Sequence, residues 1–455
     1  MVRIKMMKEF IKKFIPSFLL SWYHFLLAFL GALIFGFPSR LRQGFGLRLD
    51  GVGLRPDEVG GQAKKLKIIG VTGTNGKSTT VEMVSKILET AGYKVAALSS
   101  IKFKIRDKEW PNELRMTMPG RFILQRFLRQ AEDADCQYVV LEVTSEGIKQ
   151  HRHQFIDFEV AVFTNLSPEH IEAHGSFEKY REAKGKLFQA TKKVHILNLD
   201  DKNTGYFLKF PAEKKYLFKT KNQKPKTKNQ NLEILEAENI KIKTGGVDFK
   251  IQEVPFHLNL IGGFNVDNAL AAISVAKSQN ISLEICKKAL ERIEGMPGRM
   301  EIVIAEPFKV IVDYAFTPNA LEKVYQIIQE TRNKRQETRM ICVLGSCGGG
   351  RDKWKRPILG KLAGEYCDEV IVTNEDPYDE DPMEIINQVA SGAGEKAKKI
   401  LDRRGAIREA LEIAKPEDVV IITGKGCEPS IWITGSKSIS WDDREVVKEE
   451  FKRLS

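Results

Sequence analysis

The sequence contains few cysteines, six in 455 residues, and no two of them form a C-x-x-C pair. That spacing argues against a zinc ribbon and a thioredoxin-like redox motif. Six cysteines do not make a disulfide framework in a chain of this length, so we expect free thiols in a reducing compartment. The chain also lacks an internal repeat of fixed period. Its composition, 42% hydrophobic and 29% charged, excludes a disordered chain.

Most of the chain also lacks net charge. The formal net charge of +12 comes from residues 1–60, with nine Lys/Arg and four Asp/Glu, and residues 214–228, with seven Lys and no acidic residue. These stretches contribute +5 and +7, so the rest of the chain is neutral. A basic face spread over the whole protein is not expected, and neither is a nucleic-acid partner. We interpret residues 219–231, within and beyond the lysine-rich stretch, as a solvated loop; a local nucleic-acid patch is the alternative.

Residues 14–39 form a run of 26 residues without a formal charge, long enough to cross a bilayer, which takes about 20 apolar residues. Two prolines and two glycines are expected to break or bend a continuous helix here: Pro16, Gly31, Gly36 and Pro38. Basic residues flank both sides, so charge gives no orientation. No Ala-x-Ala-like cleavage site follows. Three interpretations stay open: a segment in or on a membrane, a hydrophobic hairpin packed on the protein's own body or in a dimer, and a cleaved signal.

Short apolar runs that end in polar residues alternate with helical patterns along the remaining chain. The expected strands are residues 66–72, 95–98, 138–142, 160–164, 310–312, 340–344, 369–373 and 419–423. The expected helices are residues 78–91, 120–134, 177–191, 319–332, 357–367, 382–392 and 404–414. This alternation is typical of α/β domains with a parallel sheet. We predict an N-terminal segment (1–60), a central P-loop domain with a parallel sheet (61–297) and a Rossmann-like C-terminal α/β domain (298–455).

A glycine-rich turn between the first strand and the first helix predicts a phosphate-binding loop. Backbone N–H groups of such a turn and of the following helix N-terminus point at phosphate oxygens. A lysine there balances phosphate charge, and the next hydroxyl binds Mg²⁺. The strict Walker pattern fails, because Val71 stands at its first glycine. The nucleotide-binding residues predicted from this turn are Gly73, Thr74, Asn75, Gly76, Lys77, Ser78 and Thr79.

The string 70–80 (GVTGTNGKSTT) resembles the nucleotide loop of the Mur ligases, the ATP-dependent enzymes of peptidoglycan stem-peptide synthesis. Folylpolyglutamate synthases have a similar loop. Further motifs favour the Mur ligases, and within them the UDP-N-acetylmuramoyl-tripeptide synthetase branch. These motifs lie at residues 141–152, 164–175, 180–188, 260–272, 295–301, 312–319, 348–357 and 424–428. The resemblance runs from about residue 66 to the C-terminus and implies ATP and Mg²⁺ as cofactors.

The same resemblance implies roles for single residues. The implied metal ligands are Ser78, Glu142, His170 and a carbamylated Lys184. Carbamylation turns an ammonium into a carboxylate-like group that can hold a cation, whereas Lys186 is expected to be an ordinary solvated lysine. The implied catalytic residues are Lys77, Lys184, His170 and Arg299. Further ATP contacts are implied for Asn268, Arg299 and Asp313, and substrate contacts for Thr117, Thr144, Gln150, Arg152, Arg351, Asp376 and Glu428.

Two departures from the family pattern bear on the substrates. Tyr378 stands where the branch has the arginine that recognises the far carboxylate of diaminopimelate, so we do not expect that amino acid. Acidic neighbours favour a cationic side chain such as lysine or ornithine. Only about 60 residues precede the phosphate loop, where the branch has a domain that grips UDP. A lipid-linked acceptor at a membrane surface is the resulting hypothesis.

The resemblance therefore implies a cytoplasmic ATP-dependent acid–amino acid ligase, attached to the inner face of the membrane through residues 14–39 if that segment is a membrane signal. Its substrates are expected to be a muramoyl peptide, UDP- or lipid-linked, and an amino acid. A substrate carboxylate attacks the γ-phosphate, and the amine displaces phosphate from the acyl phosphate. The alternatives are a ligase for another acidic acceptor, such as folate polyglutamate, and a non-catalytic membrane-attached nucleotide-binding scaffold.

Overall fold

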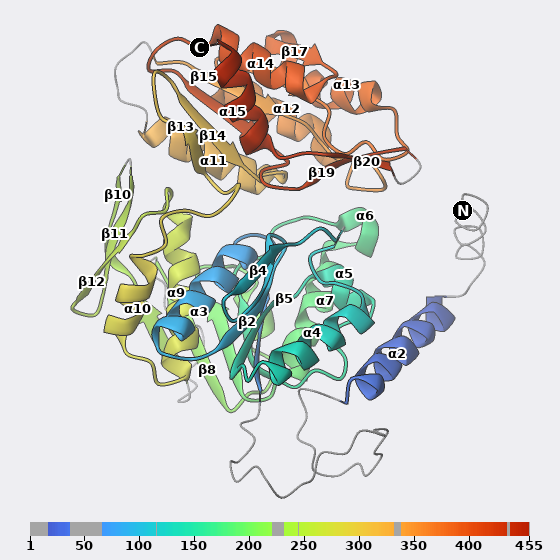
Figure 1. Cartoon of the computed structure of the whole chain (residues 1–455), viewed down its shortest axis with the longest axis vertical. Coiled ribbons are helices and arrows are strands. Elements are labelled where there is room, and N and C mark those ends of the chain that lie inside the picture. The colour runs from blue at the N-terminus through green and yellow to red at the C-terminus, as the bar shows by residue number, and fades with distance from the viewer. Residues whose placement is uncertain are drawn as a thin grey trace, which may run out of the picture.

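The computed structural model describes residues 17–36, 66–114, 116–220, 232–243, 245–331, 338–434 and 437–454. These residues form two stacked lobes, with one helix from the N-terminal segment on the flank of the first lobe (Figure 1). Each lobe is a sheet with helices on both faces, which confirms the predicted α/β class.

A mostly parallel sheet forms the centre of the first lobe. Its strands lie in the order β4 (Lys108–Pro111), β3 (Lys102–Ile105), β2 (Val95–Leu98), β5 (Tyr138–Glu142), β1 (Lys67–Thr72), β6 (Phe158–Phe163), β7 (Val194–Asn198), β8 (Lys214–Lys219) and β9 (Leu232–Glu236). Strands β1, β5 and β6 are neighbours, so their carboxyl ends meet at one edge. The edge strands β3 and β4 are antiparallel and were not predicted. Each has only four residues, and β4 begins with two charged residues, so both give a weak strand signal.

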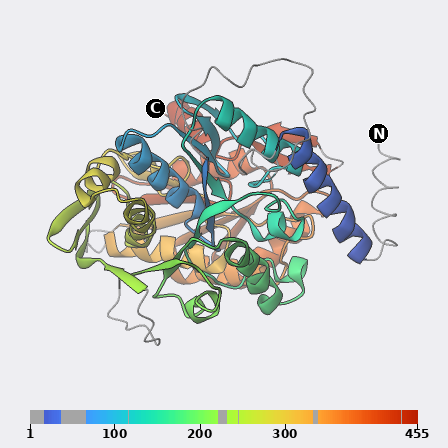
Figure 2. The ribbon, with the colours of Figure 1, turned by 90° about the horizontal axis from the view of Figure 1, so that it is seen from below.

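Helices cover both faces of this sheet (Figure 2). One face packs on α3 (Lys77–Thr90), α9 (Phe264–Ser278) and α10 (Leu283–Leu290). The other packs on α4 (Arg121–Asp133), α5 (Ser145–Lys149) and α7 (Phe177–Ala190). The strands are buried on both sides, which is why they are nearly continuous apolar runs. The short helices α6 (Ile171–His174) and α8 (Thr204–Phe207) lie between the longer elements.

A small antiparallel sheet extends the first lobe beside α9 and α10. It contains β10 (Glu238–Lys243), β11 (Gly246–Ile251) and β12 (Val254–Leu258). Its inner side chains join the hydrophobic core under α9. This sheet was not predicted, because its strands are short and polar on their outer face.

The second lobe has the strand order β13 (Glu301–Ile304), β14 (Lys309–Asp313), β18 (Val419–Thr423), β15 (Met340–Leu344), β16 (Glu369–Thr373) and β17 (Ala397–Ile400). Its pairs are parallel except for the edge strand β13. One face packs on α11 (Pro318–Thr331), α12 (Lys355–Tyr366) and α13 (Pro382–Ala393), the last followed by the 3-10 turn η1 (Gly394–Lys396). The other packs on α14 (Arg403–Ile413) and α15 (Asp443–Leu454). The hairpin β19 (Ser430–Ile433) and β20 (Lys437–Ser440) borders the gap between the lobes.

The N-terminal apolar run contains α2 (Ser17–Ile34), a continuous helix that packs on α4. Gly31 lies inside this helix, so the expected break at that position is wrong. Gly31 faces the start of α4, where an added Cβ would be in ordinary van der Waals contact, and a helix tolerates one glycine at a cost of about 1 kcal/mol. Packing on the protein's own body agrees with one of the three interpretations, although the second arm of a hairpin and the basic flanks lie outside the described residues. Across the described ranges, no helix is both long and apolar enough to cross a bilayer.

The lysine-rich stretch 214–228 is not a loop over its whole length. Its first six residues form β8, in which Tyr216, Leu217 and Phe218 are buried. Lys219 at the end of the strand is buried too and pairs with Glu236 at 2.8 Å. Because the prediction counted charges, it overlooked the apolar run between the lysines of this strand. The remainder, from residue 221, falls outside the described residues.

Candidate active site

A cavity of about 530 Å³ lies between the two lobes at the carboxyl ends of β1, β5 and β6. All the residues singled out by the sequence motifs line it. They are Gly73, Thr74, Asn75, Gly76, Lys77, Ser78, Thr79, Thr117, Glu142, Thr144, Gln150, Arg152, His170, Lys184, Asn268, Arg299, Asp313, Arg351, Asp376 and Glu428. The position agrees with the rule that ligands of open α/β sheets bind beyond the carboxyl ends of the strands.

The glycine-rich turn after β1 has a backbone that other residues could not adopt without strain. Gly76 has a φ of 81°, and a Cβ there would lie 2.2 Å from Asn268 Oδ1. A Cβ on Gly73 would lie 2.0 Å from Thr164 Oγ1. Asn165 holds the tip, because its Oδ1 accepts from Asn75 N at 2.9 Å and its Nδ2 donates to Asn75 O at 3.1 Å. The turn therefore delivers the N-terminus of α3 to the cavity in a fixed shape.

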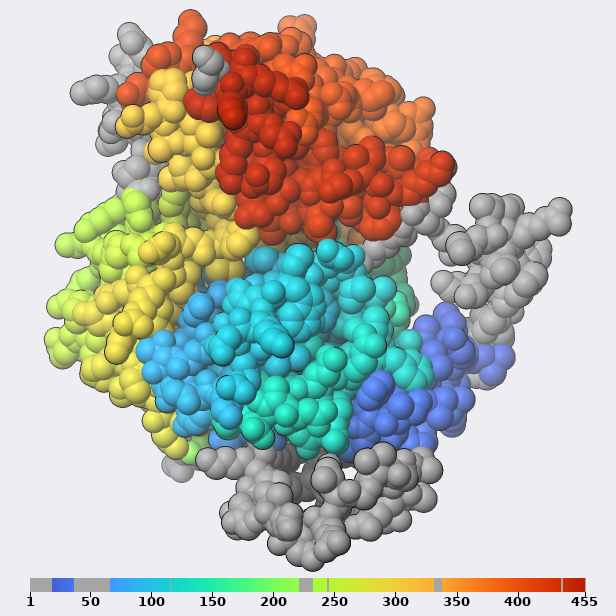
Figure 3. All heavy atoms as spheres, in the orientation of Figure 1, coloured from blue at the N-terminus to red at the C-terminus, as the bar shows by residue number. Residues whose placement is uncertain are grey.

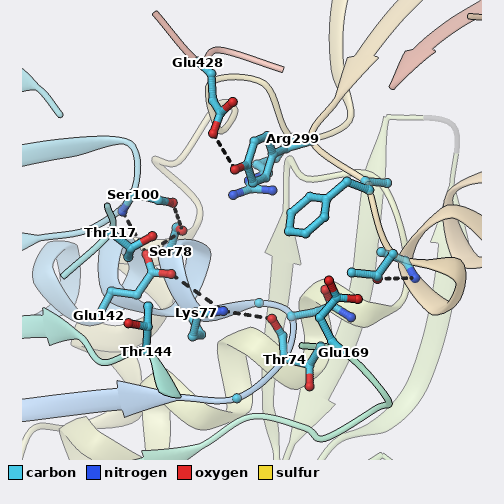
Figure 4. A pocket seen from close by; sticks show the side chains of 18 of the residues that line it. Thr74, Lys77, Ser78, Ser100, Thr117, Glu142, Thr144, Glu169, Arg299 and Glu428 are labelled. Atoms are coloured by element: carbon cyan, nitrogen blue, oxygen red, sulfur yellow. Dashed lines mark hydrogen bonds and ion pairs between the residues drawn. The ribbon is translucent and has the colours of Figure 1, made fainter. Parts of the chain in front are cut away.

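Lys77 and Ser78, the first residues of α3, meet Glu142 at the end of β5 (Figure 4). Ser78 Oγ donates to Glu142 Oε2 at 2.8 Å, and Lys77 Nζ lies 3.7 Å from Glu142 Oε1. Ser100 N also donates to Glu142 Oε2, at 2.9 Å. Lys77 Nζ donates to Thr74 O at 2.8 Å. Burial lowers the pKa of Lys77, and the nearby Glu142 opposes that shift.

Lys184 and His170 lie on the other side of the phosphate loop. Lys184, on α7, is buried, donates to Gly73 O at 2.7 Å and lies 4.6 Å from the centre of the Tyr180 ring. Burial lowers its pKa well below the usual value, and the charge of Lys77 adds to the shift. Burial also lowers the pKa of His170 to about 2, with Arg351 and Lys184 contributing. A neutral amine and a neutral imidazole are the forms that react with carbon dioxide or bind a metal.

The residues expected to contact the acceptor follow β5 and precede α4. Thr144 caps α5 by accepting from Gly147 N at 3.1 Å. Arg152 is buried, donates to Gln150 Oε1 at 2.7 Å and hydrogen-bonds Met118 O. Thr117 is the residue before Met118 in the chain and also lines the cavity. The four predicted residues of this group are therefore brought together, although they lie in separate segments.

The second lobe contributes the opposite wall. Asp313, at the end of β14, accepts from Met300 N and Ala315 N, each at 2.7 Å. The Arg299 guanidinium lies 4.3 Å from the centre of the Tyr314 ring. Tyr314 Oη donates to Glu428 Oε1 at 2.5 Å, so Glu428 points into the gap (Figure 4).

The part of the cavity expected to hold the amino acid contains positively and negatively charged side chains. Burial raises the pKa of Tyr378, and the charge of Arg351 opposes that shift. Asp376 accepts from Lys425 Nζ at 3.0 and 2.9 Å and from Trp432 N at 2.9 Å. That buried lysine is shared, because Lys425 Nζ also donates to Glu428 Oε2, so one cation faces two carboxylates. Sequence reasoning missed this lysine, although it lies within the motif 424–428.

Contacts between the lobes cross the gap next to His170. Asp352 accepts from Ile171 N at 3.3 Å and from Glu172 N at 3.0 Å. Lys355 Nζ lies 2.9 Å from Glu169 Oε1, and both side chains are about 4% exposed. Burial raises the pKa of Glu169, and Lys355 opposes that shift. No role was predicted for these residues, although they lie within the quoted motifs 164–175 and 348–357.

Comparisons with known proteins agree with this geometry. Residues 71–276 match the family model of the Mur ligase middle domain, and residues 298–426 match that of the Mur ligase, glutamate ligase domain. A UDP-N-acetylmuramyl-tripeptide synthetase of Roseiflexus sp. (strain RS-1) is 37% identical over 422 residues, 87% of this chain and 80% of the relative. A UDP-N-acetylmuramoyl-L-alanyl-D-glutamate–2,6-diaminopimelate ligase of Syntrophomonas wolfei (strain DSM 2245B / Goettingen) is 36% identical over 406 residues, 86% of this chain and 79% of the relative.

Solved structures give the same result at the level of the fold. A UDP-N-acetylmuramoyl-L-alanyl-D-glutamate–2,6-diaminopimelate ligase has a TM-score of 0.57 at 29% identity, covering 86% of this chain and 79% of the other. A folylpolyglutamate synthase of Mycobacterium tuberculosis, complexed with ADP and AMPPCP, has a TM-score of 0.63. It covers 80% of this chain and 89% of the other at 16% identity, a likeness of fold alone. The resemblance found in the motifs is confirmed.

Proposed function

Since this chain belongs to the Mur ligase family, ATP-dependent ligases that form amide bonds in peptidoglycan precursor synthesis, we propose that it joins an amino acid to a muramoyl-peptide carboxylate through an acyl phosphate. The observation that carries the proposal is the shared cavity. Its first-lobe wall has the phosphate loop and acceptor residues, and its second-lobe wall has Arg299, Arg351 and Glu428. We also propose the division at 1–60, 61–297 and 298–455.

In the proposed reaction the acceptor carboxylate attacks the γ-phosphorus of ATP, forming a P–O bond as the bond to ADP breaks. Lys77 and Arg299 stabilise the negative charge on the transferred phosphoryl group. Arg351 holds the carboxylate of the incoming amino acid by a two-point contact. The amine, near Glu428, then attacks the acyl carbon, and inorganic phosphate and the surplus proton leave. Asn268 and Asp313 hold the adenine and the ribose.

The residues present fit Mg²⁺. Ser78 Oγ and Glu142 Oε2 are 2.8 Å apart beside the phosphate loop, and both are oxygen ligands of the kind that Mg²⁺ prefers. A second position fits between His170 and Lys184 once Lys184 carries a carbamate. No cluster of three or more His, Cys, Asp or Glu occurs in the described part of the chain, so phosphate and carbamate oxygens would complete either site. When bound, the metal neutralises phosphate charge.

The amino acid is proposed to have a cationic side chain, such as lysine or ornithine. Tyr378 stands where a second carboxylate would need an arginine. Among the acidic neighbours, Asp376 is paired with Lys425, whereas Glu375 is buried and its Oε2 has no hydrogen-bond partner among the described residues. Glu375 lines the cavity, so it supports this preference better than Asp376 does.

For the location and the carrier of the acceptor, we propose a cytoplasmic enzyme held at the inner face of the membrane through residues 14–39. The acceptor is a muramoyl peptide on either UDP or a lipid. The support is the uncharged run and its basic flanks, together with the position of α2 next to the acceptor residues. An enzyme that uses the UDP-linked peptide without residues 1–60 and ignores the lipid-linked peptide would exclude the lipid carrier.

The deciding experiment is amino-acid-dependent phosphate release over a panel of amino acids and acceptors. Release with a muramoyl peptide supports the proposal, and release only with a folate acceptor favours the alternative ligase. Lys184→Ala should abolish release, while Lys186→Ala, two residues away on the same helix, should keep it. A nucleotide-binding scaffold would release no phosphate in response to any amino acid and would be indifferent to both substitutions.

A further inference from the structure

The helix α2 presents a face of small residues to the first lobe. Ala28 and Ala32 are buried there, and a Cβ on Gly31 would lie 3.6 Å from Arg121 O and Phe122 Cα at the start of α4. Small residues let two helices approach closely. This face is therefore covered by the protein itself, and only the opposite face is free to meet a partner.

The opposite face is large, apolar and exposed to solvent. The helix lies on the flank of the first lobe (Figure 3). Trp22 is 69% exposed, Leu26 53% and Ile34 64%. The other exposed members of this apolar face are Leu19, Tyr23 and Leu30. Their spacing places them on one side of the helix. The helix contains no charged residue, and soluble monomers rarely expose a continuous apolar stripe of this kind.

The sequence around α2 indicates what covers this face. Lys5, Lys8, Lys12 and Lys13 precede the helix, and Arg40, Arg42 and Arg48 follow it. Basic flanks are attracted to anionic headgroups, about 1 kcal/mol per residue near the surface. Tryptophan and tyrosine are the residues enriched where a bilayer meets water. A protein partner would gain no hydrogen bond or ion pair from charged groups on this helix, whereas lipid needs none.

We propose that α2 lies in the plane of an anionic bilayer, with the Leu19–Ile34 outer face in the lipid and the small-residue face on α4. A helix that keeps one side on its own protein can enter the headgroup boundary but cannot be surrounded by acyl chains. The segment is thus an in-plane anchor on the surface of the membrane and not a segment that crosses it.

This orientation places the acceptor end of the cavity at the lipid surface. Ser21 Oγ lies 2.8 Å from His151 Nε2, and His151 stands between the two acceptor residues Gln150 and Arg152. The rings of Phe25 and Phe155 lie 5.2 Å apart just beyond this contact. Resting on the proposed function, the inference assigns the acceptor to a carrier lipid in the same bilayer.

Vesicle binding tests the inference without using ligase activity. The full chain should sediment with phosphatidylcholine vesicles that contain phosphatidylglycerol, weakly with pure phosphatidylcholine, and less as salt increases. Leu26→Glu combined with Leu30→Glu should reduce binding at least about tenfold, because two leucines are lost from the lipid contact. Leu401→Glu and Ile439→Glu change exposed apolar residues of the second lobe and should bind as the unchanged protein does.

Three outcomes would overturn the inference. One is absence of binding to either vesicle, and another is equal binding by the Leu26→Glu/Leu30→Glu protein. The third is a dimer in solution that this variant dissociates, which would make a second copy the occupant. Acceptor assays separate this result from the ligase proposal: the variant should keep phosphate release with a soluble acceptor and show a raised KM only for a vesicle-borne acceptor. If the unchanged protein released no phosphate with any acceptor, the ligase proposal would be refuted and the vesicle-binding result would be unaffected.

Discussion

The ion pair between Lys355 and Glu169 is predicted to hold the two lobes in the closed arrangement. The pair joins α12 of the second lobe to the segment before α6, with 2.9 Å between Nζ and Oε1. Both residues are about 3% exposed, and Glu169 Oε2 has no other hydrogen-bond partner among the described residues. Removing only the lysine would leave a buried carboxylate uncompensated.

The size of this effect follows from the burial. Breaking a buried pair by removing one partner costs about 3–5 kcal/mol, which corresponds to roughly two to three and a half powers of ten in an equilibrium constant. Opening the gap between the lobes would return Glu169 to water and remove the cost. Lys355→Met should therefore shift the chain towards the open arrangement rather than unfold it.

The assay compares turnover with nucleotide binding. Lys355→Met should lower kcat/KM for phosphate release by about 10²-fold or more, while ADP binding to the first lobe changes little. Adding Glu169→Gln to that variant should recover part of the loss, because the uncompensated charge is gone. Lys353→Met is the matched control, since Lys353 is half exposed and pairs with Glu380 at the surface. An unchanged kcat/KM, or strictly additive losses in the double variant, would refute the reasoning.

Three further predictions concern the loop and the second lobe. Asn165→Ala removes both hydrogen bonds to Asn75, each worth about 1 kcal/mol, so the KM for ATP should rise by up to about 30-fold with little change in thermal unfolding. Arg403→Met leaves the buried Asp443 without its bidentate partner and should lower the free energy of unfolding by about 3–5 kcal/mol in urea titrations. Arginine hydrogen bonds from α14 lower the pKa of Glu450 to about 2. This stabilisation is present above pH 4.5 and lost as the pH falls towards 2, so Glu450→Gln should flatten the pH dependence of unfolding in that window.

The strands at the centre of each sheet could be predicted closely from the sequence. The runs 138–142, 340–344, 369–373 and 419–423 match β5, β15, β16 and β18 residue for residue. A strand buried on both faces must be apolar throughout, and the loop that follows must be polar, so both ends are marked in the sequence. The edge strands lack this constraint, which explains why β3, β4 and the sheet β10–β12 went unrecognised. Lys219, the last residue of β8, was assigned to a loop for a different reason, because the charge of the lysine-rich stretch hid the strand.

The members of the candidate site were named from the family motifs, and the structure brings them to one cavity. The residues that pair with them were not named from the sequence. Asp376 pairs with Lys425, 49 residues further along the chain, and Glu169 meets Lys355 across the gap between the lobes. Such pairs depend on how loops from different elements meet, and a local pattern carries no information about that distance. Only the structure shows that Asp376 shares the Lys425 ammonium with Glu428.

Polar contacts inside the cavity stand in for the contacts that its ligands would make. In the described chain, Lys77 Nζ donates to Thr74 O, and Ser78 Oγ donates to Glu142. These contacts occupy the ammonium that phosphate would contact and the oxygen atoms that a metal would bind, so binding exchanges one set of polar contacts for another. Such an exchange contributes little net free energy for each hydrogen bond. The larger contribution must come from charge, because burial disfavours the cationic form of Lys77 and an anion beside it relieves that cost. The neutral composition of the two lobes is consistent with this design, in which a few buried cations, rather than a basic surface, select the triphosphate.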